Sequence, residues 1–123
     1  MCSILTNTTV DNQLNKLERS SDRNMIEKRL YDFAKESDIN TSGVLDETSY
    51  SLKRMPHELS NIKKIRIGRH RIYYHGHYSK CSYFVFYIKQ FKKDDKDIED
   101  DKQFQKKLIR FFNESSSKEI LPL

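Results

Sequence analysis

The apolar positions in the first third of the chain repeat with the spacing of two amphipathic helices. One set recurs at i, i+4 and i+7, and consists of Val10, Leu14 and Leu17. A second set shares one face of a helix over residues 22–35, and consists of Ile26, Leu30, Phe33 and Ala34. Side chains at these spacings lie on one side of a helix. The pattern therefore predicts a helical hairpin, which a short Thr-rich strand over residues 2–9 precedes.

The middle of the chain changes to the two-residue alternation of β-strands. The polar positions of two successive strands are Lys64, Arg66, Arg71, Tyr73 and His75. They alternate with Ile65, Ile67, Ile72 and Tyr74. Gly68 begins the turn between these strands, and residues 76–80 are expected to connect the second strand to a third. We expect an antiparallel meander with an apolar underside.

Strict alternation continues through the third strand. It places Phe84, Phe86 and Ile88 opposite Tyr83, Val85, Tyr87 and Lys89. The upper face of the meander, away from the isoleucines, is then expected to carry Lys64, Arg66, Arg71, Tyr73, Tyr87 and Lys89. The sequence thus predicts a basic and aromatic surface on one side of a sheet.

The last third begins with an acidic stretch and ends in an amphipathic helix. The apolar face of this helix consists of Phe104, Leu108, Phe111 and Phe112. Acidic side chains just before a helix suit the positive end of its dipole. Residues 38–49 are rich in turn formers and predict a loop, and residues 115–123 predict a flexible tail. The predicted fold class is α+β in a single domain over residues 1–123: an N-terminal strand, a helical hairpin, a three-stranded antiparallel meander and a C-terminal helix.

Charge is distributed unevenly along the chain. The whole protein carries a net charge of +5, but residues 51–93 carry eleven basic side chains against one acidic side chain, a local net charge of +10. Residues 1–50 have a net charge of −3 and residues 94–123 one of −2. A surface that served only solubility would intersperse both signs. The basic segment therefore predicts a polyanion or an acidic protein as partner.

Several function classes lack the residues that they need. With three glycines in the whole chain, there is no phosphate-binding Gly-rich loop and no nucleophile elbow. The longest apolar run, residues 83–88, is too short to cross a membrane, so we expect no membrane partner. Cys2 and Cys81 make no disulfide framework, and we expect reduced thiols in a cytoplasmic protein.

The stretch HGHYSKC, residues 75–81, can be interpreted as a zinc site or as an ordinary hairpin. His75, His77 and Cys81 are all good zinc ligands and lie within seven residues of sequence. A structural zinc site needs a fourth ligand, however, and the two histidines straddle Gly76 in an expected turn. We therefore predict a polar hairpin, with no metal and no cofactor.

The block LKRMPHELSNIKKIRIGRHRIYY, residues 52–74, resembles the central part of the RelE/ParE superfamily, the toxins of type II toxin–antitoxin modules. Members of this family typically carry a basic or polar strand of the form Arg-Ile-Arg-Ile-Gly, then two further residues, and then an arginine, an aliphatic residue and a tyrosine. The family order of a strand, a helical hairpin and three antiparallel strands, often with a C-terminal helix, is also the order predicted above. The resemblance covers nearly the whole chain.

This resemblance implies a ribosome-dependent mRNA endonuclease that uses a basic sheet face and no metal. The implied catalytic residues are Lys64, Arg66, Arg71 and Lys93. The implied substrate-binding residues are Arg69, Tyr73, His75, Tyr87, Lys89 and Lys92. Such cleavage needs a base for the 2′-hydroxyl, cations for the phosphorane and an acid for the leaving oxygen. Lys64 or a neighbour is the candidate base, Arg66 and Arg71 would hold the phosphate, and His70, His75, Lys92 or Lys93 would be the acid. Tyr73 or Tyr87 would stack on a base of the RNA.

Two other functions compete with the nuclease. Many family members have a catalytic tyrosine or histidine soon after the last strand, where this chain has DDKDIEDD, and Ile62 replaces an active-site lysine. These departures favour the gyrase-inhibiting branch of the superfamily. A non-enzymatic RNA- or ribosome-binding module would need only charge and stacking. The expected partners are the ribosome with its mRNA and an acidic cognate antitoxin protein.

Overall fold

The computed structural model describes residues 2–17, 19–36, 50–51, 56, 59–77, 80–92, 98–114 and 118–119. Its elements are, in chain order, β1 (Ser3–Thr6), α1 (Thr8–Asn15), α2 (Ser20–Glu36), β2 (Tyr50–Ser51), β3 (Lys63–Ile67), β4 (His70–His77), β5 (Ser82–Gln90), the 3-10 helix η3 (Ile98–Asp100), α4 (Lys102–Phe112) and β6 (Lys118–Glu119). The predicted α+β class is confirmed. The predicted loop over residues 38–49 lies outside the described residues.

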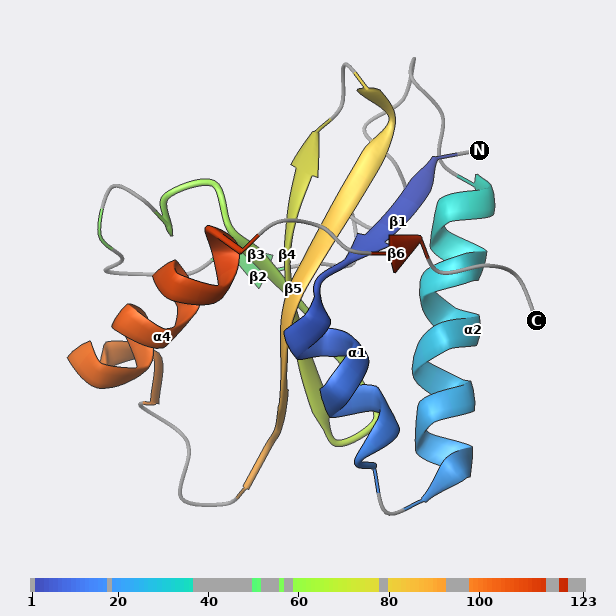
Figure 1. The fold of residues 1–123 in the computed structure, drawn as a ribbon, viewed down its shortest axis with the longest axis horizontal. Coiled ribbons are helices and arrows are strands. Elements are labelled where there is room, and N and C mark those ends of the chain that lie inside the picture. Colours follow the sequence, from blue (N-terminus) through green and yellow to red (C-terminus); the bar gives the residue numbers. More distant parts are fainter. Residues whose placement is uncertain are drawn as a thin grey trace.

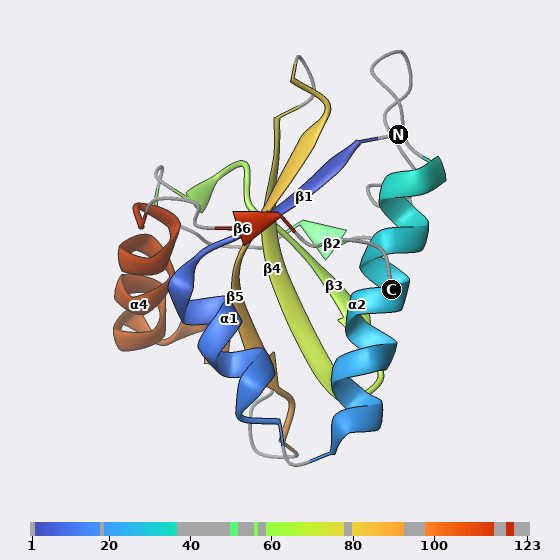
Figure 2. The same ribbon diagram turned by 45° about the vertical axis from the view of Figure 1, so that its right-hand side comes forward.

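The strands form one mixed sheet in the order β2-β3-β4-β5-β1-β6. β1 runs parallel to β5, and the other neighbouring strands are antiparallel. Helices α1 and α2 cover one face of the sheet, and α4 lies on the other side (Figures 1 and 2). The protein therefore has three layers, with the sheet in the middle.

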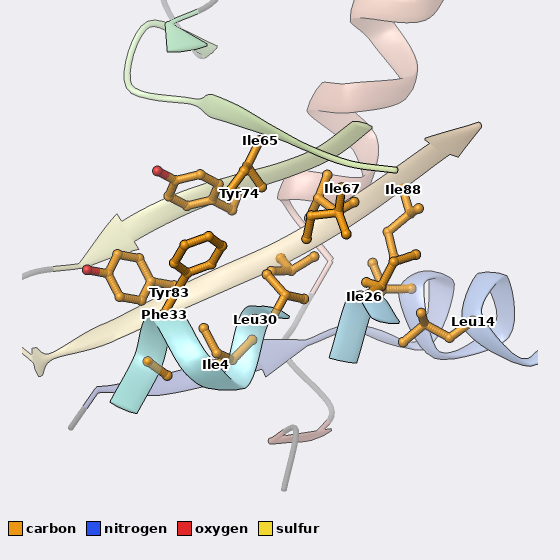
Figure 3. Close-up of a cluster of buried hydrophobic side chains, with 14 of the residues drawn as sticks. Ile4, Leu14, Ile26, Leu30, Phe33, Ile65, Ile67, Tyr74, Tyr83 and Ile88 are labelled. Carbon is orange, nitrogen blue, oxygen red and sulfur yellow. The ribbon is translucent and has the colours of Figure 1, made fainter. Parts of the chain in front are cut away.

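The first core fills the space between the sheet and the helical hairpin (Figure 3). Its helical members include Val10, Leu14, Ile26 and Leu30, and its strand members include Ile65, Ile67, Ile72, Tyr74 and Ile88. The apolar positions predicted from helical and strand spacing thus meet here. The prediction that the isoleucines of β3 and β4 form a buried underside is confirmed.

A second core lies on the face that was expected to be open. It consists of Leu59, Ile62, Tyr73, Phe86, Phe104 and Leu108. The apolar side of α4 needs a partner, and the aromatic residues of β4 and β5 supply one. The prediction of an exposed upper face is therefore wrong for Tyr73 and Arg71, which are both buried.

A β-bulge in β5 changes which of its side chains face which core. Tyr73 pairs with Tyr87 but Tyr74 pairs with Val85, so Phe86 is an extra residue on β5. A bulge of this kind interrupts the strict alternation of sides. Tyr83, Val85 and Ile88 consequently belong to the first core, whereas Phe84, Phe86 and Tyr87 lie with the second. The prediction places Tyr87 and Ile88 on the correct faces, but it is wrong before the bulge, where Tyr83 and Val85 were expected on the upper face and Phe84 and Phe86 on the underside.

Two further boundaries differ from the predictions. β4 continues to His77, through part of the stretch 76–80 that was predicted as a connection. Lys118–Glu119, within the predicted flexible tail, forms β6 and pairs with β1. Spacing alone did not indicate either, because a two-residue strand carries almost no periodicity.

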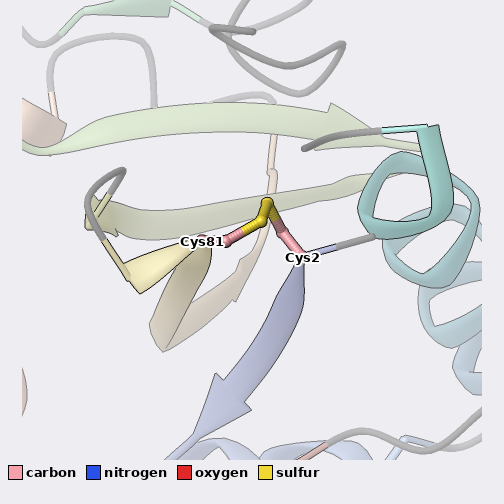
Figure 4. Close-up of a disulfide and its surroundings, with 2 residues drawn as sticks. All are labelled: Cys2 and Cys81. Atoms are coloured by element: carbon pink, nitrogen blue, oxygen red, sulfur yellow. A yellow bond between two sulfur atoms is a disulfide. The ribbon is translucent and has the colours of Figure 1, made fainter. Parts of the chain in front are cut away.

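Cys2 and Cys81 form a disulfide (Figure 4), so the prediction of reduced thiols is wrong. The cause is the parallel pairing of β1 and β5, in which Ser3 lies opposite Ser82. The residues just before these strands are therefore neighbours as well, with Cα atoms 4.6 Å apart. That distance suits a disulfide. The bond joins the start of β1 to the start of β5 across a sequence separation of 79.

Asn7 connects α1, the bulge in β5 and the end of α4. Its side-chain oxygen accepts a hydrogen bond from the Val10 backbone N–H at 2.8 Å, which caps α1. Its amide nitrogen donates to the backbone carbonyls of Phe86 at 3.2 Å and Phe111 at 3.1 Å. Nearby, the Thr9 hydroxyl donates to Glu114 at 2.8 Å. The C-terminal end of α4 is therefore held against the start of α1.

Replacing this fully buried side chain should destabilise the protein. We expect Asn7→Ala to lower the free energy of unfolding by about 1–3 kcal/mol, because the cap is lost and two carbonyls lose their donor. Asn7→Asp should be destabilising too, since it keeps the cap but has no N–H to donate. Urea melts of both variants test this. The control is Asp101→Ala, which removes the exposed N-cap of α4 and should cost only about 1 kcal/mol.

Candidate anion-binding site

Three side chains from β3 and β4 converge on one carboxylate from η3. The Lys64 ammonium donates to both Glu99 oxygens, at 2.7 Å and 2.9 Å. The Tyr73 hydroxyl donates to Oε1 at 3.0 Å, and Arg71 Nη1 lies 3.4 Å from the same oxygen. We call Lys64, Arg71 and Tyr73 the anion site. Their shared acceptor is a single negative charge.

The sheet register brings the anion site together. Lys64 pairs with Tyr73 across β3 and β4, and Arg71 precedes Tyr73 by two residues on the same strand and therefore the same face. Glu99 reaches them from η3, whose position is fixed by a hydrogen bond from Gln105 Nε2 in α4 to the Glu99 carbonyl at 2.9 Å. Two adjacent strands thus supply the donors, and the segment before α4 supplies the acceptor.

Burial strengthens these contacts because water competes for them less. Tyr73 is fully buried, and the side chains of Lys64 and Glu99 are 13% and 15% exposed. Burial, followed by the charge of Glu99, raises the pKa of the Tyr73 hydroxyl far above its usual value. Tyr73 therefore keeps its proton at neutral pH and is available as a donor.

Arg71 has donor capacity that Glu99 does not use. Its guanidinium lies 4.1 Å from the ring centroid of Phe91, a cation–π contact. Its Nε is buried and has no hydrogen-bond partner among the described residues. A cavity of about 190 Å³ adjoins it, lined by Arg66, Gly68, Arg69, His70, Arg71 and Phe91. The Arg71 fork therefore borders a basic pocket.

A larger cleft of about 500 Å³ lies between β5 and α4. Among the described residues, its charged lining consists of Lys89, Lys106, Lys107, Arg110 and Asp101. Tyr87 also lines it, and its ring stacks on Phe111 with an interplanar angle of 7°. Burial raises the pKa of Tyr87, while the charge of Arg110 opposes the change. The cleft is thus strongly basic, with an aromatic ring in its wall.

The structure gathers some of the predicted site residues and separates others. Lys64, Arg71 and Tyr73 meet at Glu99, while Arg66, Arg69 and Lys92 are exposed. Tyr87 and Lys89 line the larger cleft. His75 instead packs edge-on against Phe112, with ring centroids 5.4 Å apart, and burial lowers its pKa. Lys93 lies outside the described residues.

Two predicted roles do not fit these positions. The ring of Tyr73 is buried against Phe104 and Tyr87, so it is not available to stack on a base. Lys64 is engaged by the Glu99 carboxylate at 2.7 Å and 2.9 Å, which is the arrangement of a group that binds an anion. Both residues are better suited to holding an anion.

Four residues at these sites were not predicted from the sequence. They are Glu99, Lys106, Lys107 and Arg110. Glu99 belongs to the acidic stretch that was interpreted only as the approach to a helix. The three basic residues alternate with the apolar positions of α4, and their helical spacing was a usable signal once α4 was placed against β5.

The candidate zinc ligands His75 and His77 lie on β4, and Cys81 precedes β5. Cys81 is bonded to Cys2, which removes it as a thiolate ligand. Within the described ranges, no group of three or more His, Cys, Asp or Glu side chains is arranged to hold a metal ion. In the same part of the chain, no helix has both the length and the apolar character that a membrane span requires.

No protein-family model, curated protein or solved structure matches this chain at a significant level. A functional assignment therefore depends on the chemistry of the chain's own residues.

Proposed function

We propose that the protein is a RelE/ParE-type toxin of a type II toxin–antitoxin module and cleaves mRNA on the ribosome. The observation that carries this proposal is the convergence of Lys64, Arg71 and Tyr73 on one negatively charged group. Two cations and a neutral hydroxyl around one point are what a phosphodiester in transit to a phosphorane requires. The resemblance of residues 52–74 to the superfamily supports the same proposal.

In this proposal the anion site acts on the scissile phosphate. Lys64 and Arg71 would stabilise the charge that develops on the phosphorane oxygens, in place of the Glu99 carboxylate. Tyr73 keeps its proton at neutral pH, so its hydroxyl is suited to donate to a phosphate oxygen or to the leaving 5′-oxygen. This assignment replaces the role of base that the sequence suggested for Lys64.

The rest of the RNA strand would follow the basic surfaces on either side. Lys89, Lys106, Lys107 and Arg110 line the larger cleft, and Arg66, Arg69 and Lys92 surround the hairpin between β3 and β4. Lysine and arginine at such positions contact phosphates without selecting a base. An acidic antitoxin would be attracted to the same surfaces. The ribosomal target places this activity in the cytoplasm.

A non-enzymatic RNA- or ribosome-binding module is a second candidate, and one observation favours it. Glu99 already neutralises Lys64 and Arg71, whereas the described lining of the larger cleft has more basic than acidic side chains. Binding through that cleft would inhibit translation without cleavage. No contact among the residues that the structure describes gives comparable support to the gyrase-inhibiting alternative.

A programmed-ribosome assay separates these functions. We expect the purified protein to cleave mRNA only when ribosomes are present, so that primer extension gives new 5′ ends within the decoded region. Inhibited translation with intact mRNA would favour the binding module. A parallel supercoiling assay with gyrase should show no trapped DNA breaks, and breaks there with intact mRNA would contradict the proposal.

A further inference from the structure

Helix α4 is held to the sheet by contacts other than those of Glu99. The second core already holds α4 to the sheet through Phe104 and Leu108, and Asn7 and Glu114 fix its C-terminal end. η3 adds no fully buried side chain of its own. Its Ile98 is partly buried against the second core, and its polar contacts with the sheet are those that Glu99 makes to Lys64, Arg71 and Tyr73.

We propose that the anion site is a phosphate-binding site which Glu99 closes in the free protein, and that a nucleic-acid phosphodiester opens it by displacing this carboxylate. The inference rests on the proposed function for the identity of the ligand, a phosphate of a nucleic-acid strand. Because Glu99 and a phosphate present the same kind of oxygen to the same donors, only one of them is bound at a time.

The donors of the site suit a phosphate better than a carboxylate. A carboxylate offers two oxygens, and Glu99 uses Oε1 for three contacts at once. Its distance to Arg71 Nη1 is long, at 3.4 Å, and Arg71 Nε stays without a partner among the described residues. A phosphate has more acceptor oxygens and matches the two-pronged geometry of a guanidinium. A phosphate that also extends toward the adjoining cavity would therefore offer Arg71 acceptors that Glu99 does not.

A basic cavity adjoins the anion site on the side of Arg71. The cavity of about 190 Å³ is lined by Arg66, Arg69 and Arg71, and the first two are exposed. A phosphate that enters there meets positive charge before it reaches Glu99. The contacts that hold the C-terminal end of α4 lie at the opposite end of that helix, so release of η3 leaves them in place.

The test compares the wild-type protein with Glu99→Gln, which keeps the shape of the side chain and removes its charge. The probes are inorganic phosphate, followed by NMR of the Arg71 side chain, and a short oligodeoxynucleotide that lacks the 2′-hydroxyl, followed by fluorescence anisotropy. We expect the affinities for both probes to be roughly 10- to 100-fold higher in Glu99→Gln than in the wild-type protein. A site that is open in only about 1–10% of the wild-type molecules has its apparent affinity lowered by that factor. Unchanged or weaker binding would overturn the proposal.

Two matched variants show whether the effect belongs to the site. Asp100→Asn removes the same charge from an exposed neighbour in η3, and Glu27→Gln removes a carboxylate that is paired with Arg23 on α2. Both should change affinity less than about twofold, since surface charges are screened by salt. If Asp100→Asn raises affinity as much as Glu99→Gln does, the effect is general electrostatics and the proposal fails. Lys64→Ala added to Glu99→Gln should abolish the gain.

A measurement on the unaltered protein keeps the proposal testable if Glu99→Gln does not fold. At matched ionic strength, phosphate should speed amide hydrogen exchange in the first turn of α4 relative to chloride, because η3 is released. Slower or unchanged exchange would count against displacement of Glu99. Neither probe needs a ribosome or a cleavable strand. Phosphate binding without mRNA cleavage would therefore refute the proposed nuclease alone, and cleavage without phosphate-induced release would refute this inference alone.

Discussion

Arg71→Ala should lower the single-turnover rate of ribosome-dependent mRNA cleavage by about 100- to 1000-fold. Removal of one donor that is directed at developing transition-state charge typically has an effect of this size. Arg71 is the member of the anion site that has both a contact to Glu99 and an unused nitrogen beside an open cavity. The measurement is a cleavage time course on programmed ribosomes with enzyme in excess.

The same change should also destabilise the fold. Arg71 is 5% exposed and packs its guanidinium on Phe91, which contradicts the simple expectation that a charge on the upper face is dispensable for folding. We expect a loss of about 1–3 kcal/mol, since Glu99 keeps Lys64 and Tyr73 as partners. Urea melts give this value, and cleavage must be measured where each variant is folded.

Two variants separate catalysis from folding. Arg29→Ala removes an exposed arginine that lies over an aromatic ring on α2, 5.5 Å from the Phe33 centroid, and it should leave cleavage unchanged. Tyr73→Phe keeps the ring in the second core and removes only the hydroxyl, so its melt should change less than that of Arg71→Ala. Full cleavage by a folded Arg71→Ala protein would contradict the catalytic assignment of Arg71. The basic surface would then act only as a docking surface.

Loss of the Cys2–Cys81 disulfide should produce the largest change in stability. We expect the free energy of unfolding of the Cys2→Ala/Cys81→Ala variant to be about 2–4 kcal/mol lower than that of the oxidised protein. The disulfide spans a sequence separation of 79 and therefore restricts the unfolded chain strongly. Alanine is preferred to serine here because Cys2 is buried, and a buried hydroxyl would add its own cost.

Dithiothreitol provides the internal control for this prediction. It should lower the stability of the wild-type protein to nearly that of the double variant, and it should leave the double variant unchanged. Thiol titration in denaturant reports how much of the protein is oxidised before each melt. Equal stability of fully oxidised and fully reduced wild-type protein would contradict the prediction.

The regular elements of the fold follow directly from residue spacing. The periodic sets of Leu14, Ile26 and Leu30, and the alternation of Ile65 and Ile67, identify buried faces because one side of each element has to leave water. The bulge at Phe86 could not be predicted in this way. An extra residue changes the pairing of two strands without changing the composition of either, so only the register in three dimensions reveals it.

The basic residues of the candidate site could be predicted from the sequence, but its carboxylate could not. The basic residues of β3 and β4 stand out because eleven positive charges are concentrated in one segment. Glu99 does not stand out, since it is one of several acids in a row and only the path of the chain after β5 selects it. The disulfide could not be predicted for the same reason, because it also depends on the path of the chain. Nothing in the sequence indicates that residues 2 and 81 are adjacent until β1 is known to pair with β5.

The parallel pairing of β1 with β5 also determines when the N-terminal strand can enter the sheet during protein synthesis. β1 is the first strand to be synthesised, but its partner in the sheet, residues 82–85, follows some eighty residues later. At bacterial and eukaryotic elongation rates this interval is roughly 4–16 s. During it, the nascent chain has its helical hairpin but no neighbour for the N-terminal strand, whose backbone groups are open to other chains. The anion site is completed later still, because Glu99 of η3 follows β5 in the chain.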